Sequence, residues 1–328
     1  MNTNRYIYVL FIIVVLALGL RLYKVSENPP AMSWDEVSIG YNAYSILKTG
    51  KDEHGIFMPV DAFASYGDYK PPLAIYITVP FIAVFGFNEL AVRLPFVIFG
   101  TLTVLMTYYL VLELFQKSKI KYQLSILSSL LLAVSPWHIN ISRAGFEANI
   151  ALFFVVLGIW LVLSARLHNK RWFIAWLPFV AAMYTFNSAR YFVPFIGLGL
   201  LMFCRKDILI QKKSFVLGII FACLAVMPLV PHIMSKEARL RFEEVNIFTD
   251  SSIVTTANSR MTYDNNSFIS KVFDNRRIGY ARSFLSHYFD HFTADFLFIK
   301  GDGNPKFSTQ DVGQLYIIDL PFLLIGLF

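Results

Sequence analysis

Hydrophobic and polar positions are arranged in long blocks along this chain. Apolar runs of helical length alternate with polar segments, and they fall at residues 6–22, 94–115, 124–139, 147–166, 172–187, 191–204, 214–231 and 314–328. A helix needs about 20 largely apolar residues to cross a bilayer, so the short run 191–204 is closer to a buried helix or half-helix. The pattern predicts an all-α polytopic membrane protein built as a transmembrane helix bundle.

Composition agrees with a membrane protein and excludes several other classes. Hydrophobic residues make up 56% of the chain, charged residues only 16%, and there are 32 Phe. Such values are typical of proteins with many transmembrane helices. Cys204 and Cys223 both lie in apolar segments, so they indicate neither a disulfide framework nor a metal site. The net charge of +7 comes mainly from short loops between the runs, which is a sign of topology and gives no reason to expect nucleic acid as a partner.

Basic residues in three of these loops predict the orientation of the chain. Cytoplasmic loops of membrane proteins carry an excess of Lys and Arg. The loops contain Lys117, Lys119 and Lys121, then Arg166, Lys170 and Arg171, then Arg205, Lys206, Lys212 and Lys213. We therefore expect a multi-pass protein of the cell membrane whose N-terminus is cytoplasmic and whose first run is a retained anchor, because no cleavage site follows it.

The apolar run 72–87 must then stay on the extracytoplasmic side. If it crossed the bilayer, the loop at 117–121 would be external. We predict instead a re-entrant or juxtamembrane helix that begins at Pro71-Pro72 and ends near Gly86. Residues 23–93 become a long first external loop.

The chain divides into three predicted parts. Residues 1–231 form the transmembrane core, 232–313 a second external loop, and 314–328 the start of a further transmembrane helix, so we expect the chain to be part of a longer protein. The second loop contains apolar residues at helical spacing, which predicts an amphipathic helix lying on the membrane or packed against the core. These residues are Ile278, Ala281, Phe284, Leu285, Tyr288, Phe289 and Phe292.

Two adjacent acids, Asp35 and Glu36, stand just beyond the first anchor. Charge beside hydrocarbon is costly unless it is hydrated or used. Neighbouring side chains diverge, so one acid can face a site while the other supports structure. We expect Asp35 to act as a general base, with Glu36 beside it as the second catalytic candidate. The alternative is helix capping, because Ser33 and Glu36 have the spacing of a capping box.

Further candidates are basic and acidic residues in the other external segments. Lys70 precedes Pro71, and its ammonium can reach a lipid phosphate or simply extend toward water from the interface. We expect Arg143 and Arg190 also to bind phosphate, although Arg190 can anchor the interface instead. Glu147, Asp68 and His138 are expected to support the site, with helix-dipole stabilisation as the alternative for Glu147. Asp35, Asp68 and Glu147 leave room for a divalent cation as cofactor.

Three common catalytic or nucleotide-binding motifs are absent from the sequence, which argues against ATP-driven pumping, dinucleotide chemistry and ordinary hydrolase chemistry. The chain has no Walker-type glycine loop, Rossmann fingerprint or G-x-S-x-G motif. An enzyme that uses a lipid-borne substrate therefore gains support, since the lipid tail can lie between helices with its phosphate at the polar boundary. The alternative is a non-enzymatic membrane protein such as a transporter of polysaccharide or lipid-linked sugar, or a scaffold subunit. Transporters concentrate ionisable groups inside their spans, where this chain has few.

The order of short motifs in the first half of the chain resembles the GT-C membrane glycosyltransferases. It is similar to the dolichyl-phosphate-mannose protein mannosyltransferases and the aminoarabinose-transferase-like enzymes. The motifs are Trp34-Asp35-Glu36, Lys70-Pro71-Pro72-Leu73, Phe85-Gly86-x-x-Glu89-x-x-x-Arg93-Leu94-Pro95, Phe99-Gly100-x-Leu102-Thr103-Val104 and Ser135-Pro136-x-x-x-x-x-Ser142-Arg143.

This resemblance implies inverting transfer of a sugar from a polyprenyl phosphate to a lipid, glycan or protein acceptor at the external face. It implies that Asp35 is the catalytic base and that Lys70 lies beside the lipid phosphate. Glu147 stands where these families often have an acid after the second cytoplasmic hairpin. In the aminoarabinose-transferase-like pattern an acid directly precedes the lysine, whereas here Tyr69 does so and Asp68 lies one position away.

Overall fold

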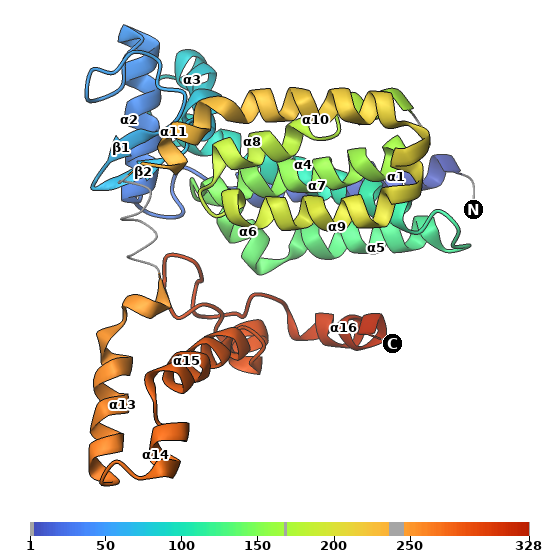
Figure 1. The fold of residues 1–328 in the computed structure, drawn as a ribbon. Helices are drawn as coiled ribbons and strands as arrows, with labels where there is room; N and C mark the ends of the chain where they lie inside the picture. Colours follow the sequence, from blue (N-terminus) through green and yellow to red (C-terminus); the bar gives the residue numbers. More distant parts are fainter. Residues whose placement is uncertain (1–2, 167–168, 236–245, 328) are drawn as a thin grey trace. The chain divides into compact units, whose positions relative to one another are not determined.

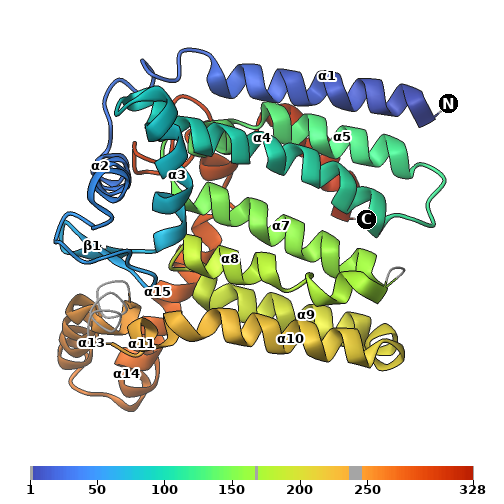
Figure 2. The same ribbon diagram turned by 90° about the horizontal axis from the view of Figure 1, so that it is seen from above.

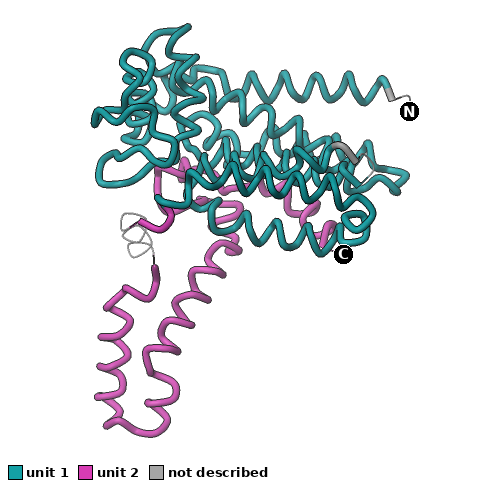
Figure 3. The backbone as a smooth tube through the Cα atoms, turned by 45° about the horizontal axis from the view of Figure 1, so that its top comes forward, with its two compact units in different colours: residues 1–232 teal, residues 233–328 magenta. Residues whose placement is uncertain are grey.

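The computed structural model describes residues 3–166, 169–235 and 246–327. Contacts between residues divide the chain into two compact units, Met1–His232 and Ile233–Phe328, which Figure 3 draws in teal and magenta. The candidate site belongs to the first.

The first unit is a bundle of long helices with a small polar subdomain at one end (Figures 1 and 2). Helix α4 lies at its centre and packs against α1, α5 and α7. In chain order the elements are α1 Thr3–Leu22, α2 Trp34–Thr49, β1 Phe63–Ser65, β2 Asp68–Lys70, α3 Pro72–Phe85, α4 Glu89–Leu114, α5 Lys121–Val134, α6 Pro136–Arg143, α7 Glu147–Ala165, η1 Asn169–Phe173, α8 Leu177–Thr185, α9 Ala189–Ile210, α10 Lys212–Val226, η2 Met227–Leu229 and α11 Val230–Ile233.

Four helices of the described residues are long and apolar enough to cross a membrane. They are Asn4–Leu22, Glu89–Leu114, Glu147–Ala165 and Lys212–Ile233, and the bent pair α5 and α6 would add a fifth. This arrangement confirms the expected all-α polytopic membrane protein. The β1–β2 hairpin is the one sheet among the described residues.

The run expected as one helix over 124–139 is broken instead. Helix α5 ends at Val134, α6 begins at Pro136, and the two are bent by 57°. The cause is Pro136, which lacks an N–H and disfavours helical geometry at the preceding Ser135. The guanidinium of Arg21 donates to the carbonyls of Leu132 and Ala133 at the end of α5. The buried side chain of Arg21 therefore provides hydrogen bonds to backbone carbonyls that the interruption between α5 and α6 leaves without helical partners.

Two other runs also differ in length from the sequence expectation. The run 172–187 becomes a 3-10 turn followed by α8, which has only 9 residues and begins beside Pro178. The run 191–204 becomes α9, a helix of 22 residues that includes the charged segment after the apolar run. The apolar run ends at Cys204, whereas the helix continues through the charged residues 205–207 to Ile210, so hydrophobicity alone underestimated its length.

The run 72–87 forms α3, whose 14 residues are few for a full crossing. Pro71 caps its start with an extended backbone, and Gly86 ends it at a φ of +79°. The predicted helix boundaries are therefore confirmed. The placement of α3 beside the membrane remains a prediction.

The polar subdomain is formed by α2, the β hairpin and α3, and both views place it at the end of the bundle opposite the N-terminus (Figures 1 and 2). The hairpin turns at Tyr66 and Gly67, which both have positive φ, as a tight two-residue turn requires. Its register pairs Phe63 with Lys70. Phe63 is fully buried among side chains of α2, α3 and α4. Burial of Phe63 therefore anchors the strand that ends at Lys70.

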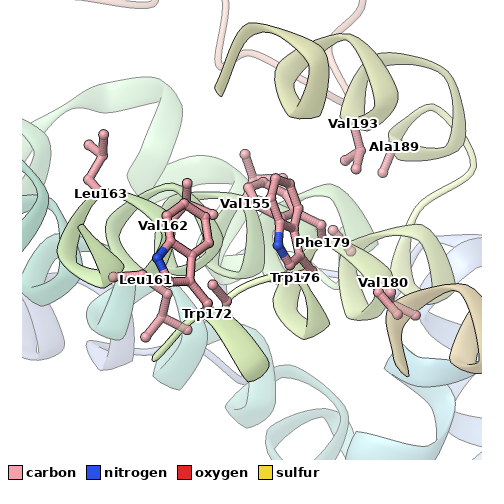
Figure 4. Close-up of a cluster of buried hydrophobic side chains, with 14 of the residues drawn as sticks. Val155, Leu161, Val162, Leu163, Trp172, Trp176, Phe179, Val180, Ala189 and Val193 are labelled. Atoms are coloured by element: carbon pink, nitrogen blue, oxygen red, sulfur yellow. The ribbon is translucent and has the colours of Figure 1, made fainter. Parts of the chain in front are cut away.

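A second apolar core holds the later helices together. Trp172, Trp176 and Phe179 lie against side chains of α7 and α9 (Figure 4). The approach is close at Gly158, where a Cβ would lie 2.8 Å from the ring of Phe179. A small residue is therefore needed at this crossing.

The second unit consists of helices with polar caps. Its described elements are η3 Ile247–Thr249, α13 Ser251–Tyr263, α14 Phe268–Phe273, α15 Arg276–Asp290, the π-helical turn η4 Asp295–Ile299, η5 Ile317–Asp319 and α16 Leu320–Leu327. Asp250, Ser267 and Asn275 cap α13, α14 and α15 by accepting backbone N–H groups. Helix α15 confirms the helix expected from the amphipathic spacing, although it ends at Asp290; the ring of Tyr288 lies against that of Phe284 on the helix and that of Phe292 just beyond its end.

Candidate active site

Three charged side chains from distant parts of the first unit meet at Lys70. Its Nζ donates to Oδ1 of Asp35 at 2.5 Å and to Oε1 of Glu147 at 3.3 Å. The partners lie 35 and 77 residues away in the sequence. The fold thus brings together the expected base, the expected phosphate ligand and one expected supporting acid.

Each of the three stands at the end of an element. Asp35 lies in the first turn of α2, which Ser33 caps, and Glu147 is the first residue of α7. Carboxylates in these positions are stabilised by the positive end of the helix dipole, typically by about 0.3 to 1 kcal/mol. Lys70 is the last residue of β2, held between the hairpin register and Pro71. The backbone positions of all three are therefore fixed by secondary structure.

The cluster is largely buried but still open to solvent. The side chains of Asp35, Glu147 and Lys70 are 19%, 12% and 7% exposed. Burial alone would lower the pKa of Lys70, but the charges of Glu147 and Asp35 outweigh it and raise that pKa above its ordinary value. Lys70 therefore carries a positive charge at neutral pH, between two acids.

Glu36, the neighbour of Asp35, has a different set of partners. Its Oε1 accepts from Nε of Arg93 at 2.6 Å, and its Oε2 accepts from the backbone N–H of Ser33 at 2.8 Å. The side chain is 1% exposed. At Gly145, a Cβ would lie only 2.7 Å from Cγ of Glu36. Both oxygens of this acid are thus engaged in structure, and the capping box that the sequence indicated is present.

Arg93 is a structural residue to which sequence reasoning gave no role. Its Nη1 donates to the carbonyls of Val25 and Pro29, and its Nη2 to that of Ala31. The side chain is fully buried. Arg93 therefore fixes the segment that leads from α1 to the Asp35 turn. The available signal was a charged residue inside a long apolar helix.

Arg143 also contacts backbone carbonyls. Its Nη1 donates to Tyr23 at 2.7 Å and to Leu20 at 3.0 Å, and its Nη2 donates to Asn28 at 2.9 Å. These acceptors include the end of α1, where free carbonyls attract cations. The geometry gives this expected phosphate ligand a capping role.

His138 lies in a buried network rather than beside Lys70. Its Nδ1 is 2.6 Å from Nη2 of Arg21, and both side chains are fully buried. Arg21 also contacts Ser142 at 3.4 Å, and Asn149 lies 3.3 Å from that hydroxyl and donates to the carbonyl of Phe96. This network connects α1, α6, α7 and α4. Arg21 was not singled out in the sequence.

Arg190 and Asp68 are held by local contacts. Nε of Arg190 donates to the carbonyl of Met183, and Oδ1 of Asp68 accepts from the N–H of Tyr69 at 2.8 Å. Nη2 of Arg190 is buried and has no hydrogen-bond partner among the described residues. Arg190 therefore keeps the N–H donors of Nη2 for a ligand.

Residues 69–232 match the family model of the dolichyl-phosphate-mannose-protein mannosyltransferases. The chain belongs to this family. It is therefore a multi-pass membrane glycosyltransferase of the GT-C type. Membership of this family implies a lipid-linked sugar donor. A comparison with curated proteins gave no match.

The family match begins one residue before Lys70 and includes Glu147 and Arg190. Asp35 lies outside the matched interval. It joins the family segment only in space, through its ion pair with Lys70.

The three acids considered for a cation are Asp35, Asp68 and Glu147, and two of them contact a lysine. Asp35 and Glu147 are both paired with the Lys70 ammonium. The part of the chain that the structure describes contains no group of three or more His, Cys, Asp or Glu side chains placed to hold a metal ion. We therefore assign no step to a metal.

Proposed function

We propose that the protein transfers a sugar, with inversion at its anomeric carbon, from a polyprenyl phosphate to an acceptor hydroxyl. Asp35 is the general base of this reaction. The observation that carries the proposal is the Lys70 ammonium between Asp35 and Glu147, next to the segment that matches a glycosyltransferase family.

The reaction balances with these groups. Asp35 accepts the proton of the acceptor hydroxyl, and the hydroxyl oxygen forms a bond to the anomeric carbon. The bond from that carbon to the phosphate oxygen breaks, and its electron pair leaves with the polyprenyl phosphate. Attack opposite the leaving group inverts the carbon. A positioned general base typically contributes about 10²- to 10⁴-fold to a rate.

Lys70 can contact both the proposed base, Asp35, and the phosphate of the sugar donor. An ammonium has three N–H donors, and two of them are directed at Asp35 and Glu147. The third is available to the leaving phosphate, whose growing charge it would stabilise.

The arrangement of the bundle supports an extracytoplasmic site. The loops that join α4 to α5 and α9 to α10 lie at the same end as the N-terminus, away from α2 and the hairpin (Figures 1 and 2). Lys117 and Lys119 lie in the first of these loops, and Lys212 and Lys213 are the first residues of α10, directly after the second loop. The positive-inside rule places them in the cytoplasm and the Lys70 cluster outside.

Reconstitution with a panel of polyprenyl-phosphate sugars and hydroxyl acceptors tests the proposal. We expect one donor to release polyprenyl phosphate as the sugar is transferred, and Asp35→Asn to slow this release by about 10² to 10⁴. Glu27→Gln is a matched control, since the Glu27 side chain is 69% exposed and pairs only with Lys24 among the described residues. Movement of an intact lipid-linked sugar across the vesicle, without release, would favour the transporter alternative.

A further inference from the structure

The turn between α8 and α9 contacts the backbone next to Lys70. Nδ2 of Asn187, in this turn, donates to the carbonyl of Tyr69 at 3.1 Å. Tyr69 directly precedes Lys70 in β2. Asn187 therefore connects the start of α9 to the strand that positions the candidate active-site lysine.

Two polar atoms in the same turn are buried without a partner. Oδ1 of Asn187 and Nη2 of Arg190 make no hydrogen bond to any described residue. The backbone N–H of Arg190 donates to the carbonyl of Asn187, so the two residues lie within one helical turn. Leaving a buried polar atom unpaired costs about 1 to 3 kcal/mol. A ligand with a donor and an acceptor would recover this cost for both atoms.

The chemistry of that ligand follows from the orientation of the amide. Because the Tyr69 carbonyl can only accept, the nitrogen of Asn187 must face it, and the free atom is an oxygen acceptor. An ionised phosphate has no proton to give to this oxygen. A hydroxyl can donate to Asn187, while Arg190 supplies a donor for a second oxygen of the same molecule.

We propose that Oδ1 of Asn187 accepts a hydrogen bond from a hydroxyl of the transferred sugar. This inference rests on the proposed function, because it deepens the donor site of that reaction. Asn187 then has two tasks, one for each end of its amide: it holds the backbone beside Lys70 and distinguishes a sugar-bearing lipid from the bare lipid phosphate.

Binding measurements test this assignment without requiring turnover. Full-chain protein in detergent is titrated with a polyprenyl-phosphate hexose and, separately, with bare polyprenyl phosphate. We expect Asn187→Leu, which removes both the acceptor and the donor to Tyr69 at similar volume, to weaken binding of the sugar-bearing lipid about tenfold more than it weakens binding of the bare lipid. Asn187→Ala should give the same selective loss, so the result does not depend on how one variant packs.

The two lipids separate this role from a purely structural one. An equal loss for both lipids would mean that Asn187 acts only through the Tyr69 backbone, and it would overturn the inference. Unchanged binding of the hexose lipid would overturn it as well. Failure of the proposed function is recognised separately, as the absence of sugar transfer by the wild-type chain whatever its binding selectivity.

Discussion

Two ion pairs stand on adjacent residues of α2, and they differ in nearly every physical respect. The pair of Glu36 with Arg93 is closed, with exposed fractions of 1% and 0%. Its remaining hydrogen-bonding atoms contact backbone groups. The cluster of Asp35, Lys70 and Glu147 is 19%, 7% and 12% exposed, and it has two negative groups for one positive group.

The difference separates a structural pair from a reactive one. A general base must reach its substrate. Glu36 cannot do so, because it is buried and both of its carboxylate oxygens are bonded to Arg93 or to the backbone of Ser33. Asp35 shares its charge with Lys70 but remains open to solvent. Neighbouring acids in one motif can therefore have separate tasks, one in structure and one proposed in chemistry.

The strongest test of this contrast is Asp35→Asn. It keeps the size of the side chain but removes the base, so we expect the rate of sugar transfer to fall by about 10² to 10⁴. Lys70 keeps Glu147 as a partner, so thermal unfolding should change less than in Glu36→Gln. Near-normal sugar transfer by the purified variant would contradict the role of Asp35 as general base, and Asp35 and Glu36 would then not differ in catalysis.

Glu36→Gln should instead affect stability. It leaves the buried Arg93 charge without its partner, and breaking a buried pair in this way costs about 3 to 5 kcal/mol. We expect a clear loss of folded protein in denaturation experiments. Wild-type stability together with a loss of transfer as large as that of Asp35→Asn would assign the base role to Glu36.

The pH dependence of stability sharpens the comparison at Lys70. In the wild type the pKa of Lys70 is raised, so its contribution to stability is complete below its unfolded pKa of about 10.4 and is lost only above that.

In the double variant Asp35→Asn with Glu147→Gln, burial acts alone and lowers the pKa of Lys70. The unfolded state then binds more protons than the folded state, so stability should rise as the pH increases from about 7 to 10. Thermal unfolding across this range measures the difference. A flat profile in the variant would show that the two acids do not set the charge of Lys70.

The smallest effect is expected at Arg143. Arg143→Gln removes donors to the carbonyls at the end of α1, and we expect a loss of about 1 to 2 kcal/mol in the free energy of unfolding. Affinity for polyprenyl phosphate should change less than about twofold. A large loss of lipid affinity without a change in stability would instead support the phosphate role that the sequence suggested for this arginine.

The amino-acid sequence by itself determined the class of the protein and several of its local features. Apolar runs of helical length require a bilayer or a large core, and Pro71, Pro72 and Gly86 define the ends of α3 through backbone chemistry alone. The capping box at Ser33 and Glu36 was also readable, because its spacing depends only on helix geometry.

Tertiary structure decided which charged residues meet. Lys70 and Glu147 are 77 residues apart, and nothing local brings them to 3.3 Å. The same applies to Glu36 with Arg93, and to Arg21 at the break before Pro136. Local rules limit what one segment can do, but the partner of a buried charge depends on which helices pack together.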